Sequence, residues 1–167
     1  MLIRNASRSY HTCMNSTLTA AAGEHYVAYK LSCLGFLAAF VRQGSPTTDL
    51  LASSLDGART VGIQVKTTIL AGRTRGRGSC KVPHHLEFPL GHAAVERASP
   101  KLVFCFVDLR DNQPDVPPDV YVVPALNLQS LYEGQDIRQY SYFRHHPTVE
   151  HMEPFKNNWQ PIIDALS

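Results

Sequence analysis

The sequence predicts an α/β fold in which a central mixed β-sheet is flanked by helices, in the order α-β-β-β-α-β-β-α. Three observations lead to this prediction. A helical pattern near the start is followed by three short segments with strand-like alternation, and the unbroken apolar segment KLVFCFVDL at 101–109 is typical of a strand at the centre of a sheet. The length of 167 residues suits one domain with a core of its own.

The first predicted element is a helix from Thr17 to Leu34. Asn15 or Ser16 can cap its start, and Gly35 can end it. Apolar residues at helical spacing predict the face that packs on the sheet. They are Ala20, Val27, Leu31 and Leu34.

Three strands are predicted next, at 36–42, 49–55 and 61–68, the first of them buried. Asp56-Gly57 between the second and third is a hairpin-turn signal. The following segment AGRTRGRGSCK is so rich in glycine and arginine that it predicts a mobile loop.

The second half of the chain predicts a short helix at 90–98, strands at 101–109 and 120–125, and a helix at 126–132. A closing helix or turn-helix is expected within 155–166, anchored by Trp159. No linker or repeat divides residues 15–167, which we expect to form one domain, and residues 1–14 are expected to be a disordered leader.

Composition sets limits on the class of protein. A hydrophobic share of 44% and a charged share of 18% are those of an ordinary soluble protein. No apolar run approaches the ~20 residues that span a bilayer, so no membrane partner is expected. The four cysteines lack CxxC spacing, which predicts reduced thiols and a cytoplasmic location.

Charge is unevenly distributed although the net charge is only +2. No acidic residue lies between Asp56 and Glu87, and this stretch contains Arg73, Arg75, Arg77 and Lys81. Such a cluster is either a solvated loop or a clamp for nucleic-acid phosphates, with affinity that falls as salt rises.

The predicted hairpin brings polar residues together. If Asp56-Gly57 is the centre of an even-length turn, Ala52 faces Val61 and Asp49 faces Gln64. Lys66 lies two residues further along the same face as Gln64. Asp49, Gln64 and Lys66 are therefore expected to converge, unless a bulge breaks the register.

Glu24 lies within the apolar stripe of the first helix. An acid facing the sheet is unfavourable unless it is paired or ligated. Alternatively, Glu24 belongs to the first turns of the helix and leans into solvent, and Lys66 is a solvated edge residue. The coincidence of four polar side chains at one place favours a site.

These segments resemble the PD-(D/E)XK nuclease superfamily, which includes Holliday-junction resolvases, many restriction enzymes and some homing endonucleases. The resemblance rests on Glu24 in AAGEHYVAYKLSCLGF, Asp49 in PTTDLLA, and Gln64 with Lys66 in IQVKTT. It covers residues 15–70 and implies a restriction-endonuclease-like core. Two departures stand out: Pro46 lies three residues before Asp49, and Gln64 stands where an acid is commonest in the family.

The resemblance implies a magnesium-dependent endonuclease that hydrolyses phosphodiester bonds in duplex or branched DNA, with manganese able to substitute. Asp49, Gln64, the backbone carbonyl of Val65, and Glu24 would hold the ion, and Lys66 would assist the attacking water. The need to cut two strands implies a homodimer or a higher homo-oligomer. The alternatives are a catalytically inactive nuclease fold that binds nucleic acid or serves as a structural subunit, and a nuclease that acts on RNA.

Overall fold

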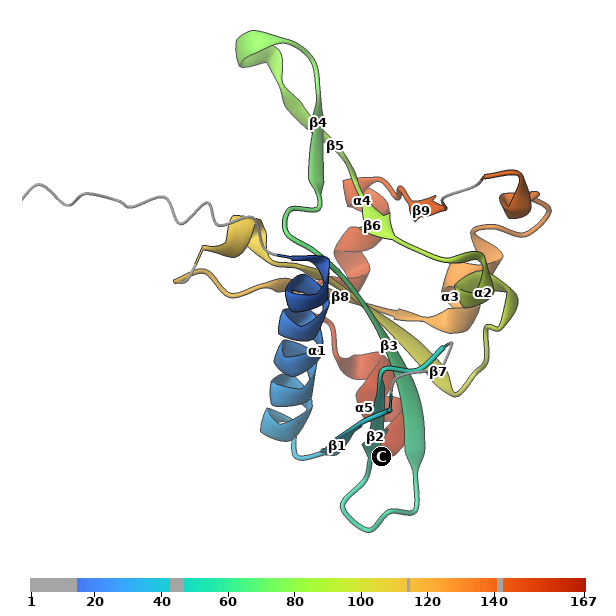
Figure 1. The fold of residues 1–167 in the computed structure, drawn as a ribbon. Coiled ribbons are helices and arrows are strands. Elements are labelled where there is room, and N and C mark those ends of the chain that lie inside the picture. Colours follow the sequence, from blue (N-terminus) through green and yellow to red (C-terminus); the bar gives the residue numbers. More distant parts are fainter. Residues whose placement is uncertain (1–14, 43–46, 114, 141–142) are drawn as a thin grey trace, which may run out of the picture.

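The computed structural model describes residues 15–42, 47–113, 115–140 and 143–167 (Figure 1). The predicted leader of residues 1–14 and the proline at Pro46 lie outside the described residues.

The centre of the fold is a five-stranded mixed sheet in the order β1-β2-β3-β7-β8. β1, β2 and β3 form an antiparallel meander, β7 runs parallel to β3, and β8 runs antiparallel to β7. The strands are β1 (Leu37–Phe40), β2 (Leu50–Ser53), β3 (Thr60–Thr68), β7 (Leu102–Asp108) and β8 (Asp119–Pro124). This confirms the predicted α/β class with a central mixed sheet flanked by helices.

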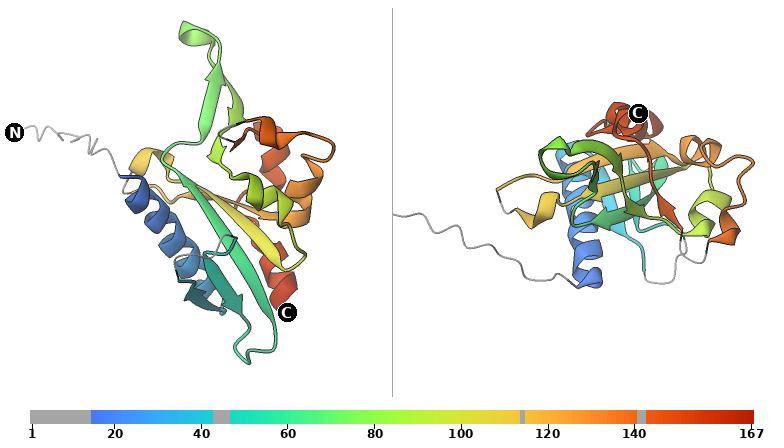
Figure 2. Two further views of the ribbon diagram at one scale, coloured as in Figure 1. Left: turned by 45° about the vertical axis from the view of Figure 1, so that its right-hand side comes forward. Right: turned by 90° about the horizontal axis from the view of Figure 1, so that it is seen from above.

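Helices and short elements surround the sheet (Figures 1 and 2). The α-helices are α1 (Ser16–Cys33), α2 (His92–Glu96), α3 (Ala125–Ser130), α4 (Val149–Met152) and α5 (Gln160–Leu166). The 3₁₀ turns are η1 (Gly78–Cys80), η2 (Arg110–Asn112), η3 (Ile137–Gln139) and η4 (Glu153–Phe155). The short strands are β4 (Gly72–Arg75), β5 (Val82–Leu86), β6 (Phe88–Pro89) and β9 (Arg144–His145).

Two apolar clusters form the core, because side chains alternate across the strands. The odd-numbered residues of β3 and β7 join residues of α1 and α5, and the predicted anchor Trp159, which directly precedes α5, belongs to the same cluster. On β7 the even-numbered Phe104 and Phe106 join a second cluster with residues of α2, α3 and β6. β7 is buried along its whole length, as the sequence predicts for a central strand.

The predicted first helix is confirmed, but its buried face is partly wrong. The Asn15 side chain caps the helix by accepting from the Thr17 N–H, and Gly35 follows its end with a φ of +86°. The buried stripe is Thr19, Gly23, Val27 and Leu31, whereas Ala20 and Leu34 are exposed. The buried stripe is shifted because α1 approaches the sheet closely at Gly23. Glycine has no apolar side chain, so the apolar periodicity of the sequence does not include this residue.

The prediction that 36–42 is a buried strand is also wrong. β1 is the edge of the sheet, and Leu37 and Phe40 are about half exposed. Apolar composition alone does not separate an edge strand from a central one.

The segment predicted as a mobile loop, 71–81, instead forms most of a β-hairpin. β4 and β5 pair antiparallel, with a register shift between Arg73 and Thr74, and the hairpin projects away from the body of the domain (Figure 1). Gly76 has a φ of +113°, and a Cβ there would lie 2.3 Å from the Cys80 carbonyl oxygen. The glycines therefore build a tight tip rather than a loop without structure.

Along the described chain, none of the helices is long and apolar enough to cross a bilayer. Cys33, Cys80 and Cys105 are free thiols.

Candidate functional site

The β2–β3 hairpin has the predicted register. Ala52 pairs with Val61 and Leu50 with Ile63, and the turn is closed where the Ser54 N–H donates to the Arg59 carbonyl over 3.0 Å. The predicted pairing of Asp49 with Gln64 is wrong, because the ladder breaks there. Both Leu50 and Asp49 lie opposite Ile63, whose carbonyl accepts from the Asp49 N–H over 2.8 Å. This is the two-against-one arrangement of a β-bulge.

The bulge directs the Asp49 side chain toward the edge of β3 that β2 leaves unpaired, which we call the open edge of β3. β2 pairs only with residues 60–63 of β3, whereas β7 pairs with 62–68. Beyond Ile63, β2 no longer pairs with β3, and the Asp49 carboxylate supplies the hydrogen-bond acceptor at this edge instead. Its Oδ2 accepts from the Val65 N–H over 2.7 Å. In a strand the N–H and C=O of one residue point to the same side, so the Val65 carbonyl faces this edge too.

Glu24 reaches the same edge from α1. The helix lies so close to β3 that a Cβ on Gly23 would fall 2.0 Å from the Thr67 Oγ1. Glu24 is half-buried beside that contact. Burial raises the pKa of Glu24 above its ordinary value, and repulsion from Asp49 raises this pKa further, while His25 and Lys66 act in the opposite direction.

Lys66 is half-buried on β3 and interacts electrostatically with both acids. Burial lowers the pKa of Lys66, while attraction to Asp49 and Glu24 acts in the opposite direction. Among the residues that the structure describes, no ion pair within 4.0 Å joins Lys66 to either acid. The site therefore holds one half-buried lysine amine and two carboxylates that interact without a direct ion pair.

Gln64 is buried on the face of β3 that carries Phe104, its register partner on β7. It brings an amide instead of a third carboxylate. Across the described ranges, no group of three or more His, Cys, Asp or Glu side chains is arranged to hold a metal ion. The candidate set has two such residues, and its remaining oxygens come from an amide and a backbone carbonyl. An all-oxygen set of this kind fits a hard divalent cation such as Mg²⁺.

A groove of about 500 Å³ opens beside Lys66. The start of α1 forms one wall, residues 65–69 form the floor, and Pro89 and Arg144 complete the lining.

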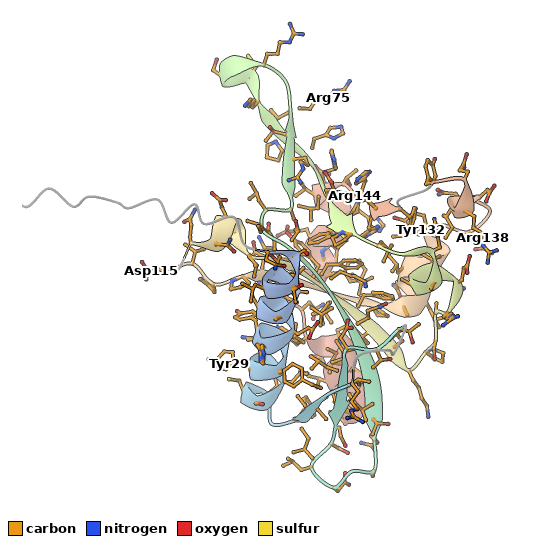
Figure 3. The ribbon with its side chains drawn as sticks, viewed as in Figure 1. Tyr29, Arg75, Asp115, Tyr132, Arg138 and Arg144 are labelled. Carbon is orange, nitrogen blue, oxygen red and sulfur yellow. The ribbon has the colours of Figure 1, made fainter. Side chains whose placement is uncertain are left out.

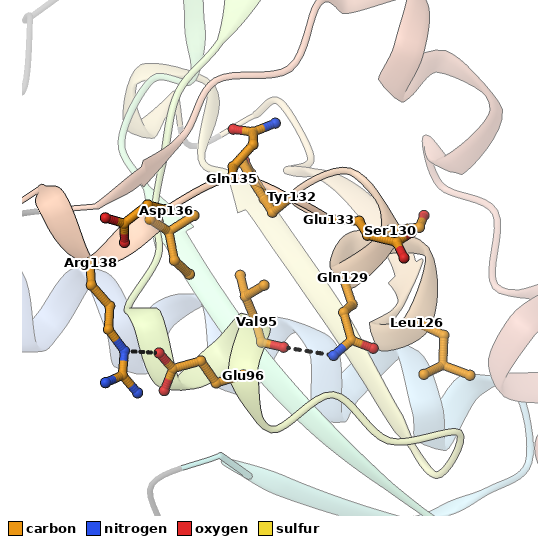
Figure 4. Close-up of a pocket in the computed structure, with 11 residues that line it drawn as sticks. Val95, Glu96, Leu126, Gln129, Ser130, Tyr132, Glu133, Gln135, Asp136 and Arg138 are labelled. Carbon is orange, nitrogen blue, oxygen red and sulfur yellow. Dashed lines mark hydrogen bonds and ion pairs between the residues drawn. The ribbon is translucent and has the colours of Figure 1, made fainter.

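A second hollow, of about 590 Å³, lies between α2, α3 and η3 (Figure 4). The Glu96–Arg138 ion pair at 2.6 Å is part of its lining, and none of the predicted site residues borders it. Of the predicted site residues, Val65 and Lys66 line the groove at β3, whereas Asp49, Gln64 and Glu24 are not part of its lining. The candidate site is therefore placed beside this groove.

The predicted cationic residues sit on the projecting hairpin, away from the residues that interact at the edge of β3, which are Asp49, Glu24 and Lys66. Figure 3 shows Arg75 on the hairpin arm and Arg144 at its base. Arg75, Arg77 and Lys81 are exposed. Arg73 is tied to the body of the domain, since it pairs with Glu87 at 2.9 Å and donates to the Leu70 carbonyl.

Three features of the site were not found from the sequence. Gly23 sets the approach of α1, and a glycine inside a helical pattern is the signal that could have indicated it. Arg144 lines the groove from a distant part of the chain, and no local pattern indicates its position. The paired acids Asp108 and Asp119 end β7 and begin β8, and they form a second acidic pair on the sheet.

Comparison with known proteins supports the fold. No protein-family model matches the chain, and no curated protein matches it. Among solved structures, the chain is similar to the bacterial homing endonuclease I-Ssp6803I, with a TM-score of 0.55 and 9% sequence identity over 90% of this chain and 92% of that one. At this identity the likeness shows a shared nuclease-like fold.

Proposed function

We propose that this protein is a metal-dependent endonuclease that hydrolyses phosphodiester bonds in DNA and belongs to the PD-(D/E)XK superfamily. One observation carries the proposal: the Asp49 carboxylate, the Val65 carbonyl and the Lys66 side chain gather where β2 ends and a groove begins. The likeness of the fold to a homing endonuclease supports it.

Asp49, Gln64, the Val65 carbonyl and Glu24 would hold a magnesium ion, with manganese as a substitute. When bound, such an ion supplies a polarised phosphate and an activated water. The bulge serves this site, because it directs the Asp49 carboxylate to the edge toward which the Val65 carbonyl points. The hydrogen bond from the Val65 N–H fixes that carboxylate in place.

Lys66 would position the attacking water and accept its proton. Because burial lowers the pKa of Lys66, a larger fraction of its amine is neutral near pH 7 than for an exposed lysine. In its protonated form the same group offsets the negative charge of the phosphate.

The β4–β5 hairpin would hold the DNA. Arg75, Arg77 and Lys81 extend from it into solvent, and no acidic residue between Asp56 and Glu87 opposes them. Contacts of these cations to phosphates would give an affinity that falls with salt and does not depend on sequence. Arg144, on the wall of the groove, extends this positive surface toward Lys66.

Cutting both strands of a duplex would take two copies, since one chain carries one set of these residues. The exposed β1 edge, with Leu37 and Phe40 about half exposed, supports assembly into a homodimer or a higher homo-oligomer.

The second candidate function is an inactive nuclease fold that binds nucleic acid, and Gln64 is the observation that favours it. A neutral amide contributes no charge to metal binding, so the site is weaker than one with three carboxylates.

A cleavage assay separates these functions. Duplex and branched DNA, with matching RNA, are incubated with wild-type protein and Mg²⁺ or Mn²⁺. Lys66→Ala is the test variant, and Lys156→Ala, which alters the Lys156–Asp119 ion pair, is the matched control. We expect DNA cutting by the wild type and by the control but not by Lys66→Ala. Binding without cutting by the wild type would support the inactive fold, and cutting of RNA alone would contradict the DNA assignment.

A further inference from the structure

Three histidines meet at the base of the β4–β5 hairpin. His84 and His85 are consecutive residues of β5, with their Nδ1 atoms 2.8 Å apart and ring centroids 5.1 Å apart. His146, which follows β9, adds a third ring with its centroid 5.4 Å from that of His85. The register shift in the hairpin explains why the two neighbours share one place, because an extra residue enters β5 there.

Arginines surround this histidine cluster. Arg73 on β4 is the register partner of His85, and Arg144 precedes His146 by two residues. Glu87 pairs with both arginines and ties β4 to β9. α4, which packs beside β5, carries Glu150 and His151.

The histidine cluster adjoins the groove of the candidate site. Arg144 and His146 are exposed while His145 between them is buried, so alternation places the two exposed side chains on the same side of the segment. Arg144 lines the groove together with Lys66. A DNA strand that lies in the groove and along the hairpin would therefore pass the histidines.

We propose that His84, His85 and His146 form a proton-linked subsite for a DNA backbone phosphate, so that the protein holds DNA more tightly as the solution becomes more acidic. The proposal rests on the proposed DNA-binding function and adds to it a pH dependence that the arginines and lysine of the hairpin do not have.

The physical basis is the partial burial of the rings together with the positive charges around them. Burial lowers the pKa of His85, and the neighbouring His146, His84 and Arg73 lower it further. Burial also lowers the pKa of His146, and Arg144 and Arg73 add to this shift. The 2.8 Å contact between two Nδ1 atoms needs one of them to be protonated and the other to accept. A phosphate anion beside the cluster would offset the positive charge and favour further protonation.

The direction of the effect follows from linkage. If bound phosphate raises the pKa of these imidazoles, the gain in affinity is full below the pKa of the free protein. It is lost as pH rises through the pKa of the complex. A rise of one unit in one imidazole corresponds to about a tenfold gain in affinity.

The test measures binding of a fluorescent duplex by anisotropy between pH 8.0 and pH 5.5, with EDTA present so that no cleavage occurs, at constant ionic strength. The variants are His84→Gln with His146→Gln in one chain, and His151→Gln as the matched control. Thermal unfolding of each variant checks that it is folded. The slope of affinity against salt is measured at both ends of the pH range.

We expect wild-type affinity to rise about tenfold or more toward pH 5.5, with a salt slope steeper by about one. The double variant should lose most of that rise, and the control should keep it. Parallel pH profiles for the wild type and the double variant would overturn this proposal alone. No DNA binding at any pH would overturn the proposed function together with it.

Discussion

Two pairs of acidic residues lie on or beside the central sheet, and the chain compensates their negative charge differently. Asp108 and Asp119 are register partners at the end of β7 and the start of β8. Asp119 pairs with Arg110 at 2.8 Å and Lys156 at 3.1 Å, and accepts from the Asn157 amide over 3.3 Å. Glu24 and Asp49, near the open edge of β3, interact with one half-buried lysine, Lys66, and form no ion pair with it within 4.0 Å among the described residues.

This difference is the basis for proposing which of the two pairs could bind a cation that the chain does not supply. Burial raises the pKa of Asp108 as well as that of Glu24, so a raised pKa does not distinguish the pairs. The cationic side chains that pair with the acids do distinguish them. Two cationic side chains of the chain satisfy Asp119, and this pair is structural. The pair at β3 lies beside a groove with its negative charge incompletely balanced, which favours binding of a cation.

The largest expected effect is a difference in cleavage rate between variants of the two acidic pairs. Asp49→Asn should lower the cleavage rate by about a thousandfold, because it removes charge from the reacting centre. Asp119→Asn, measured per folded molecule, should cleave within about threefold of the wild type. Equal losses in the two variants would remove the distinction between a functional and a structural pair.

The next effect is a difference in the free energy of unfolding between variants of the two acidic pairs. Asp119→Ala should lower the free energy of unfolding by about 1–2 kcal/mol, since it removes the carboxylate that pairs with the partly exposed Arg110 and Lys156. Glu24→Gln should stay within about 1 kcal/mol of the wild type, because Glu24 has no ion-pair partner within 4.0 Å among the described residues. Urea unfolding measures both. A larger loss in Glu24→Gln would mark Glu24 as structural.

A comparable effect tests how α1 is placed. Gly23→Ala puts a Cβ 2.0 Å from the Thr67 Oγ1, so the helix must shift, at a cost of about 1–3 kcal/mol and with a lower cleavage rate. Thr67→Ala in the same chain removes the atom that is contacted and should restore part of both losses. A double-mutant cycle measures this coupling, and additive losses would contradict the close contact.

The smallest expected effect concerns pH. Because the pKa of Glu24 is raised, its ionisation disfavours the folded state, and wild-type stability relative to Glu24→Gln should fall as pH rises above about 4.5. Below that range Glu24 is protonated and the two proteins should have the same pH dependence. Thermal unfolding against pH measures the difference. A wild type that gains stability relative to the variant in this range would reverse the assigned sign.

The sequence predicted what local patterns determine. The α1 cap at Asn15, the β2–β3 register and the buried β7 follow from turn chemistry and apolar periodicity. The bulge at Asp49 does not follow from local patterns, because it depends on the Asp49 carboxylate accepting from the Val65 N–H, a backbone donor that a neighbouring strand would otherwise satisfy. The glycine and arginine content of 71–81 predicts a loop, because local composition does not distinguish a loop from a β-hairpin whose tight tip requires glycine.

The most direct test of the central claim is the binding of Mn²⁺, followed by isothermal titration calorimetry on the wild type, Asp49→Asn and Asp119→Asn. If the incompletely balanced acids at β3 hold the ion, the wild type and Asp119→Asn should bind it with similar affinity, and Asp49→Asn should lose most of that affinity. Unchanged binding in Asp49→Asn, or a loss confined to Asp119→Asn, would contradict the assignment of the metal site to the open edge of β3.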